Sequence, residues 1–334
     1  MGARRRGHEG AGRRRRSLAA WIGGAAAALA VLAFVIFPVA LGWALVHPRR
    51  APVDTTPAAW GLAFRPVAFR SRTDRVLLSG WWIPAAGKSP LTVILAHGYG
   101  DNRLDASVPG SALMRALHAM GANVLTFDFR ASGESGGSEV SIGEFEVRDL
   151  LGAVDWARRT HPRQARRIAL LGFSMGAVAA LMAGEEDPAV GGVVADSPFA
   201  ALGPYLRANL PVWTHLPPFP FDPVILTLVP LVTGLDPAKV DPEAHMRAFG
   251  SRPVLLIAGT ADRTIPDRNS LALAHAAAPD QNVQLWLVPA AGHIQAFRRQ
   301  PAAYLAHLYR FLRRLDAAVA PPPPVGALGL AASR

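Results

Sequence analysis

A serine flanked by glycines is the residue in this chain best suited to do chemistry. Residues 172–176 read Gly-Phe-Ser-Met-Gly, with Ser174 at the centre. A serine hydroxyl needs a neighbouring base to become an effective nucleophile, and Gly-x-Ser-x-Gly is typical of a nucleophile exposed on a sharp turn between a strand and a helix. In a chain with 31 Gly the pattern can also arise by chance. A strand expected over 167–171 and a helix over 174–184 supply the context that makes it informative.

His293 is the best candidate for the base among the ten histidines. It lies in an Ala-Gly-His loop that follows an expected strand. Catalytic groups of parallel sheets gather at the carboxyl ends of the strands, so this loop can bring the imidazole to Ser174. His97 also follows an expected strand, but its glycine-rich surroundings before a helix favour a role in holding that loop.

The imidazole of such a base needs a carboxylate to fix its tautomer. Asp262 follows an expected strand and precedes His293 by one helix and one strand, so the two loops are expected to come from neighbouring strands. Asp196, which ends the strand before it, is the alternative acid, and Asp267 is interpreted as a helix N-cap. Serine, aspartate and histidine then follow one of the chain orders in which known triads occur.

Backbone N–H groups near Ser174 can stabilise the negative oxygen that forms when a carbonyl is attacked. The segment His97-Gly98-Tyr99-Gly100 can turn one N–H toward the serine, and the helix that starts at the serine supplies another. We therefore expect an oxyanion hole made by the backbone N–H groups of Tyr99 and Met175.

Strands and helices alternate between about residues 63 and 316, which predicts one α/β domain with a mostly parallel sheet and helices on both faces. Ser141 followed three residues later by Glu144 predicts a capping box, with a helix starting at residue 142. The expected strands cover 76–83, 91–96, 122–127, 167–171, 192–195, 254–257 and 283–288, and the expected helices cover 111–120, 142–159, 174–184, 268–278 and 302–315.

The segment 199–249 interrupts this alternation and is interpreted as a cap-like insertion rich in Pro and bulky apolar residues. A second membrane span there would have only the 13 uncharged residues of 223–235, whereas a helical span needs about 20. An apolar cap suits an acyl chain better than a charged peptide, unless its side chains simply pack on the domain. These side chains include Trp213, Phe219, Phe221, Ile225, Leu226 and Leu228.

An uncharged apolar segment over 18–46 exceeds the roughly 20 residues that a helix needs to cross a membrane. Trp21 and Trp43 lie near its ends, where indole rings favour the membrane interface. A cleaved signal peptide is the alternative, but this segment is long and lacks a good cleavage site. Seven Arg within residues 1–17 predict a basic cytoplasmic tail, one transmembrane anchor over 18–46, and a domain outside the cytoplasm.

The composition excludes several functions. The chain has no Cys, which excludes disulfides, thiolate metal sites and a cysteine nucleophile. The net charge of +11 is concentrated in the N-terminal tail, and no basic stripe with interleaved aromatic residues indicates nucleic acid. No motif for a metal or a cofactor is found. Residues 47–62 are interpreted as a linker, and 317–334, with four consecutive prolines, as a disordered tail.

Six segments stand in an order typical of one known family: His97–Gly100, Asp128–Ser135, Gly172–Gly176, Asp196–Phe199, Gly259–Pro266 and Gly292–His293. Through them the chain resembles the α/β-hydrolase-fold serine hydrolases, in the branch of prolyl-oligopeptidase-like and monoglyceride-lipase-like proteins. Where that family usually has Gly, this chain has Ala131, in a loop expected to support the site. The resemblance implies the α/β-hydrolase fold over 63–316 and acyl transfer to water through an acyl-serine.

We therefore predict a membrane-anchored serine hydrolase that cleaves a carboxylic ester, with Ser174 as nucleophile, His293 as base and Asp262 as orienting acid. No metal and no cofactor are expected. A serine peptidase or an acyltransferase could use the same residues. A catalytically inactive hydrolase fold that acts as a tethered binding protein is the hypothesis from another class. The expected partners are a small acyl ester and, through 18–46, the membrane; nucleic acid is not expected, and the sequence indicates no protein partner.

Overall fold

The computed structural model describes residues 18–279 and 281–330. The predicted basic tail, 1–17, and the last four residues of the predicted disordered tail lie outside them. The chain forms two compact units. Of the described residues, the helical unit comprises 18–45 with Arg207–Leu235, and the sheet unit comprises Val46–Leu206 with 236–279 and 281–330.

The sheet unit is built on an eight-stranded sheet in the order β1-β2-β4-β3-β5-β6-β7-β8. β2 runs antiparallel to both of its neighbours, β1 and β4, and all other pairs are parallel. The prediction of a mostly parallel α/β sheet is confirmed, with β1 as an additional edge strand. The strands are β1 (Arg65–Arg70), β2 (Leu77–Ile83), β3 (Leu91–Ala96), β4 (Asn123–Phe127), β5 (Arg167–Phe173), β6 (Val190–Asp196), β7 (Val254–Gly259) and β8 (Val283–Val288).

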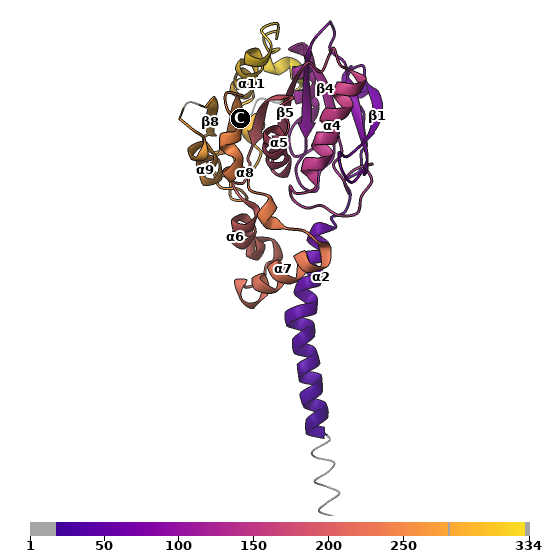
Figure 1. The fold of residues 1–334 in the computed structure, drawn as a ribbon, viewed down its shortest axis with the longest axis vertical. Helices are drawn as coiled ribbons and strands as arrows, with labels where there is room; N and C mark the ends of the chain where they lie inside the picture. Colours follow the sequence, from indigo (N-terminus) through magenta and orange to yellow (C-terminus); the bar gives the residue numbers. More distant parts are fainter. Residues whose placement is uncertain (1–17, 280, 331–334) are drawn as a thin grey trace, which may run out of the picture. The chain divides into compact units, whose positions relative to one another are not determined.

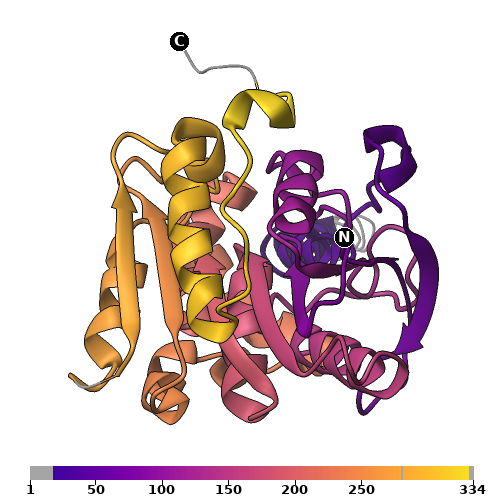
Figure 2. The same cartoon turned by 90° about the horizontal axis from the view of Figure 1, so that it is seen from above.

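Helices cover both faces of the sheet (Figures 1 and 2). Alternate residues of each strand point to opposite faces, so Ile94 belongs to one buried cluster and Leu95 to the other. Helices α3 and α11 pack on the Leu95 face, and α4, α5 and α9 pack on the Ile94 face. Their bounds are α3 (Gly110–Ala119), α4 (Glu146–Thr160), α5 (Met175–Glu186), α9 (Arg268–Ala276) and α11 (Pro301–Leu315).

The start of α4 differs from the prediction. The helix begins at Glu146, and the Glu146 carboxylate accepts hydrogen bonds from the backbone N–H (3.0 Å) and the hydroxyl (2.6 Å) of Ser141. Glu146 therefore takes the place expected for Glu144. Ile142 and Gly143 have positive φ values of 58° and 128°, which a right-handed helix excludes.

The C-terminal segment also differs from the prediction of disorder. Residues 317–330 lie on the sheet unit, with Val319 and Leu328 buried in the cluster on the α3 and α11 face. The backbone N–H of Ala320 donates to the carbonyl of Met120 (3.0 Å). Composition indicates disorder in this proline-rich segment, but two buried apolar side chains and backbone pairing hold it in place.

The helical unit contains a long apolar helix, Leu18–Val46, of 29 residues (Figure 1). Within the described part of the chain, no other single helix is long and apolar enough to cross a membrane. Part of the predicted insertion, Arg207–Leu235, belongs to this unit, while its flanks belong to the sheet unit. The insertion contains α6 (Leu202–Thr214), α7 (Pro218–Thr233), η3 (Pro237–Lys239), α8 (Pro242–His245) and η4 (Met246–Phe249). The remaining short elements are η1 (Leu32–Ile36) and α2 (Phe37–Val46) within the long helix, η2 (Pro57–Trp60), α10 (Ala296–Arg299) and η5 (Val325–Leu328).

Two glycines allow the turn between β5 and α5. A Cβ atom at Gly172 would lie 2.1 Å from the carbonyl oxygen of Gly176, and one at Gly176 would lie 2.1 Å from the carbonyl oxygen of Ala96 at the end of β3. No side chain fits at such distances. The turn therefore packs backbone directly on backbone and places Ser174 between the two glycines.

We predict that Gly176→Ala destabilises the protein by about 1–3 kcal/mol because the added methyl group has no space. Without this clash, Ala would stabilise a helix by about 1 kcal/mol relative to Gly. Gly87→Ala is the matched control, since nothing lies within 4 Å of its added Cβ, and its effect should stay within about 0.5 kcal/mol. Thermal unfolding of the detergent-solubilised full chain measures both. Equal stability of the two variants would contradict the backbone contact.

Candidate active site

Ser174 stands at the tip of the turn between β5 and α5. Its φ of 53° and ψ of −118° form a backbone conformation that non-glycine residues rarely adopt and that clusters at functional sites. Its backbone N–H donates to the carbonyl of Asp196 at the end of β6 (2.8 Å). The serine is half-buried, so it remains partly accessible from the surface.

His293 reaches Ser174 from the loop that follows β8. Its Nε2 lies 2.9 Å from Ser174 Oγ, and its Nδ1 lies 2.7 Å from Asp262 Oδ2. An ionised carboxylate can only accept hydrogen bonds, so Nδ1 carries the ring proton and Nε2 accepts from the hydroxyl. The three residues singled out by the sequence thus form one continuous chain of hydrogen bonds.

Asp262 is held in place by its own loop after β7. Its Oδ1 accepts hydrogen bonds from the backbone N–H groups of Thr264 and Ile265, both at 2.8 Å, and the side chain is fully buried. The N–H of Ala261 donates to the carbonyl of Ala291 (2.9 Å), which joins this loop to the histidine loop. Because β7 and β8 are neighbours, the two loops leave the sheet side by side.

Asp196, the alternative acid, has a different environment. Its Oδ1 accepts a hydrogen bond from the hydroxyl of Ser197 (3.0 Å). Burial raises the pKa of Asp196 to about 7, against the opposing effects of Ser197 and His293. The carboxylate that contacts His293 Nδ1, at 2.7 Å, is that of Asp262. Asp267 occupies the N-cap position of α9, as predicted, but its side chain makes no capping hydrogen bond.

Ser197 links Asp196 to the histidine loop, a contact that the sequence does not reveal. Besides donating to Asp196, its Oγ accepts a hydrogen bond from the N–H of Ile294 (3.2 Å), the residue next to His293. The only signal in the sequence is the position of Ser197 directly after a strand, within one of the segments that carry the family resemblance.

His97 holds its own loop, as its surroundings in the sequence suggest. Its Nδ1 lies 2.7 Å from the carbonyl oxygen of Gly98, and its Nε2 accepts a hydrogen bond from the N–H of Phe129 (3.0 Å). Burial lowers the pKa of His97. In this neutral ring, Nδ1 therefore holds the loop after β3 on itself, and Nε2 joins that loop to the loop after β4.

The two segments expected to supply oxyanion donors both adjoin Ser174. A Cβ atom on Gly98 would lie 3.6 Å from Ser174 Cβ, so the loop that carries Tyr99 passes directly beside the serine. Met175 is the first residue of α5, and the N–H groups in the first turn of a helix have no partner within the helix.

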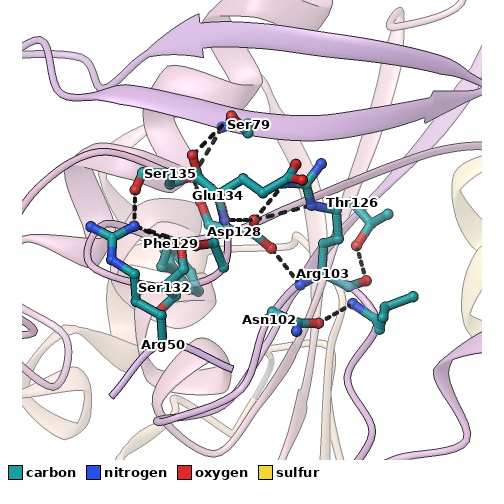
Figure 3. A network of polar contacts seen from close by, with 12 residues as sticks. Arg50, Ser79, Asn102, Arg103, Thr126, Asp128, Phe129, Ser132, Glu134 and Ser135 are labelled. Carbon is teal, nitrogen blue, oxygen red and sulfur yellow. Dashed lines mark hydrogen bonds and ion pairs between the residues drawn. The ribbon is translucent and has the colours of Figure 1, made fainter. Parts of the chain in front are cut away.

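A buried ion pair supports these loops (Figure 3). Asp128 accepts hydrogen bonds from the Arg103 guanidinium (2.6 and 3.1 Å) and from the backbone N–H groups of Arg103 and Glu134, both at 2.7 Å. The Glu134 carboxylate also binds Arg103, at 2.6 Å. Arg50 donates to the carbonyls of Ser135 and Gly137 in the loop after β4. Such pairing offsets the cost of burying charge and fixes both loops relative to the sheet.

Comparison with known proteins identifies the family and the fold of this chain. A family model described as serine aminopeptidase, S33, matches residues 87–220. YqkD of Bacillus subtilis is 33% identical over 181 residues, which cover 53% of this chain and 57% of that protein. The chain thus spans little more than half the length of this relative. Protein Rv2307c of Mycobacterium tuberculosis is 30% identical over 223 residues, which cover 66% of this chain and 69% of the relative.

A solved structure with the same architecture is the esterase Pf2001 of Pyrococcus furiosus. It matches with a TM-score of 0.68 and 29% identity, over 81% of this chain and 98% of the esterase. The sheet order, the strand–turn–helix at Ser174 and these matches lead to one assignment. The chain belongs to the serine hydrolases of the α/β-hydrolase fold, in the family that the S33 serine aminopeptidase model describes.

Proposed function

We propose that this protein is a membrane-anchored serine hydrolase that cleaves a carboxylic ester through an acyl-serine intermediate. The observation that carries the proposal is the hydrogen-bonded chain from Asp262 through His293 to Ser174, with distances of 2.7 and 2.9 Å. The residue types and the geometry are those of a Ser-His-Asp triad.

In the first half of the reaction, Ser174 Oγ attacks the ester carbonyl carbon while His293 Nε2 takes the hydroxyl proton. The bond between the carbonyl carbon and the alcohol oxygen then breaks, and His293 returns the proton to the leaving alcohol. Water repeats the sequence on the acyl-serine and releases the carboxylic acid. Asp262 stabilises the imidazolium that forms in each half.

The backbone N–H groups of Tyr99 and Met175 are assigned to the oxyanion of the tetrahedral intermediate. One donor of this kind contributes about 3 kcal/mol to the transition state in a well-studied enzyme. Among the described residues, no group of three His, Asp or Glu side chains could hold a metal ion. Besides the substrate and water, the steps above need only side chains and amides of this chain.

An ester is favoured over a peptide because the similar Pyrococcus structure is that of an esterase. The S33 description favours the second candidate, an aminopeptidase. An aminopeptidase must recognise the free α-amino group of its substrate, whereas an esterase of simple acyl groups gains nothing from it. This difference separates the two candidates experimentally.

Membrane attachment is assigned to the helix Leu18–Val46. Large apolar side chains are exposed along it, including Trp21 at 78% and Leu29 at 65%. Such exposure is unfavourable in water and favourable in the hydrocarbon of a bilayer. The seven preceding Arg residues favour an N-terminus in the cytoplasm and a sheet unit outside it.

We predict that Asp262→Asn lowers kcat by about 10⁴, because loss of the carboxylate leaves the imidazole in the wrong tautomer, as the same change does in a well-studied serine protease. Asp196→Asn, the matched control, should cost far less, since its carboxyl pairs with Ser197. Steady-state hydrolysis of a short acyl ester measures both variants.

The double variant Ser174→Ala with Asp262→Asn should be scarcely less active than Ser174→Ala, because triad residues act as a unit. If Asp262→Asn retains near-normal turnover while Asp196→Asn does not, the acid role belongs to Asp196.

Methyl propionate and alanine methyl ester test the substrate class, because they share a leaving group and differ by the α-amino group. We predict a kcat/KM at least about tenfold higher for the propionyl ester, a difference of about 1.4 kcal/mol in the transition state. Preference for the alanyl ester, together with cleavage of alanyl peptides, would show an aminopeptidase instead.

The orientation is tested with protease added to cells whose outer layer has been made permeable. We expect the sheet unit to be degraded while the inner membrane is intact, because the positive-inside rule places it outside the cytoplasm. Protection until that membrane is broken would reverse the orientation, and a mature chain starting near residue 45 would show a cleaved signal.

A further inference from the structure

We propose that the 207–235 hairpin, formed by the end of α6 and by α7, enters one leaflet of the bilayer beside the N-terminal helix, where lipid acyl chains cover its exposed apolar face. The inference rests on the membrane anchoring proposed above and adds a second membrane-contacting element to it.

The first observation is the packing of α7 along the N-terminal helix. A Cβ atom at Gly42 would lie 2.5 Å from Val229 Cγ2 and 3.1 Å from Ile225 Cγ2, so the absence of a side chain at Gly42 lets the two helices approach closely. Phe34 stacks on Phe221 with 5.8 Å between ring centroids. Small residues at close helix contacts are typical of helices associated within membranes.

The second observation is the apolar face that this packing leaves exposed. Phe219 is 81% exposed, Leu231 75%, and Val212 and Val232 each 61%. Asp222 is the only Asp, Glu, Lys or Arg between residues 208 and 235, and its side chain is buried. Over 208–235 the exposed face is therefore mostly apolar and carries no exposed Asp, Glu, Lys or Arg, as contact with lipid favours; His215 and Thr227 are its exposed polar side chains.

The shape of the hairpin suits one leaflet rather than a full crossing. Helix α7 has 16 residues, fewer than the roughly 20 that a span needs. Taken together, helices α6 and α7 are long and apolar enough to cross a membrane, but the chain bends by 120° at the break between them. A segment bent this sharply enters and leaves the membrane on the same side.

The position of the contact between α7 and the N-terminal helix agrees with a hairpin that enters one leaflet. Helix α7 meets the N-terminal helix between Phe34 and Trp43, which lie roughly 18 and 5 Å from its end at Val46, with a rise of about 1.5 Å per residue. Half of the hydrocarbon core is about 15 Å thick. The contact thus extends through about one leaflet on the side away from the basic tail.

The third observation is a groove of about 480 Å³ between the two helices. Its walls are aliphatic and aromatic, with almost no polar surface, and suit a hydrocarbon chain. The groove continues the lipid-facing side of the N-terminal helix, so the occupant that we assign to it is a lipid tail, which the surrounding bilayer supplies. The lining residues include Val35, Ile36 and Val39 from that helix and Leu228, Leu231 and Val232 from α7.

The absence of Cys from the whole chain makes single-cysteine labelling a clean test. Leu231→Cys, Leu29→Cys and Leu271→Cys are each labelled with an environment-sensitive nitrobenzoxadiazole dye. The full chain is then reconstituted in phosphatidylcholine vesicles with and without doxyl-labelled phosphatidylcholine. Leu29 represents the N-terminal helix, and Leu271, an exposed leucine on α9 of the sheet unit (39% exposed), is the matched control. Hydrolysis of a water-soluble ester within twofold of the unmodified chain shows that each labelled protein is folded.

We expect quenching at Leu231 to reach at least half of that at Leu29, with little quenching at Leu271. Phe219→Cys provides a second label on the same face and should behave like Leu231. Quenching at Leu29 but not at Leu231 or Phe219 overturns this inference and leaves the anchor in place. No quenching at Leu29 overturns the anchor itself and the inference with it. Disulfide cross-linking of Leu231→Cys between two chains would show that a second copy covers this face, and would also overturn the inference.

Discussion

At the end of β5 the chain turns so tightly that the backbones of Gly172, Gly176 and Ala96 are in direct contact. This contact holds Ser174 at a positive φ, and the hydrogen bond from its N–H to Asp196 ties the turn to the next strand. Since β5 lies between β3 and β6, the loops after both neighbours adjoin the serine. The loops after β7 and β8 then bring Asp262 and His293 to this serine.

The loops that carry Asp262 and His293 are held in place by hydrogen bonds. The loops after β7 and β8 are joined by backbone hydrogen bonds, and the carboxylate of Asp262 is held by two further amides. The Arg103–Asp128 pair fixes the loops after β3 and β4 from the other half of the sheet. A catalytic triad requires such rigid positioning, because a displaced His293 could not take the proton of the Ser174 hydroxyl efficiently. The helical unit instead consists of apolar helices with exposed apolar faces and carries the proposed membrane contacts.

Much of this architecture could be predicted because its signals are local. Buried parallel strands are continuous apolar runs, and their carboxyl ends meet at one edge. The glycine motif around Ser174 and the positions of Asp262 and His293 after strands therefore identified these residues, with Asp196 as the alternative acid. What could not be predicted depends on contacts between distant segments. Ser197 acquires its role only when the loop after β8 lies against it. Val319 and its neighbours pack although their composition indicates disorder, and α7 belongs with the N-terminal helix because Gly42 leaves room for it.

The activation of Ser174 by His293 can be tested by reaction of the full chain with a fluorophosphonate, followed by peptide mass spectrometry, because this reagent reacts much faster with activated serines than with ordinary ones. We expect modification at Ser174 alone, no modification in Ser174→Ala, and strongly slowed modification in His293→Gln, while Ser197→Ala is still labelled at Ser174. Modification of another serine, or none in a chain with an unchanged unfolding midpoint, would show that Ser174 is not the activated nucleophile.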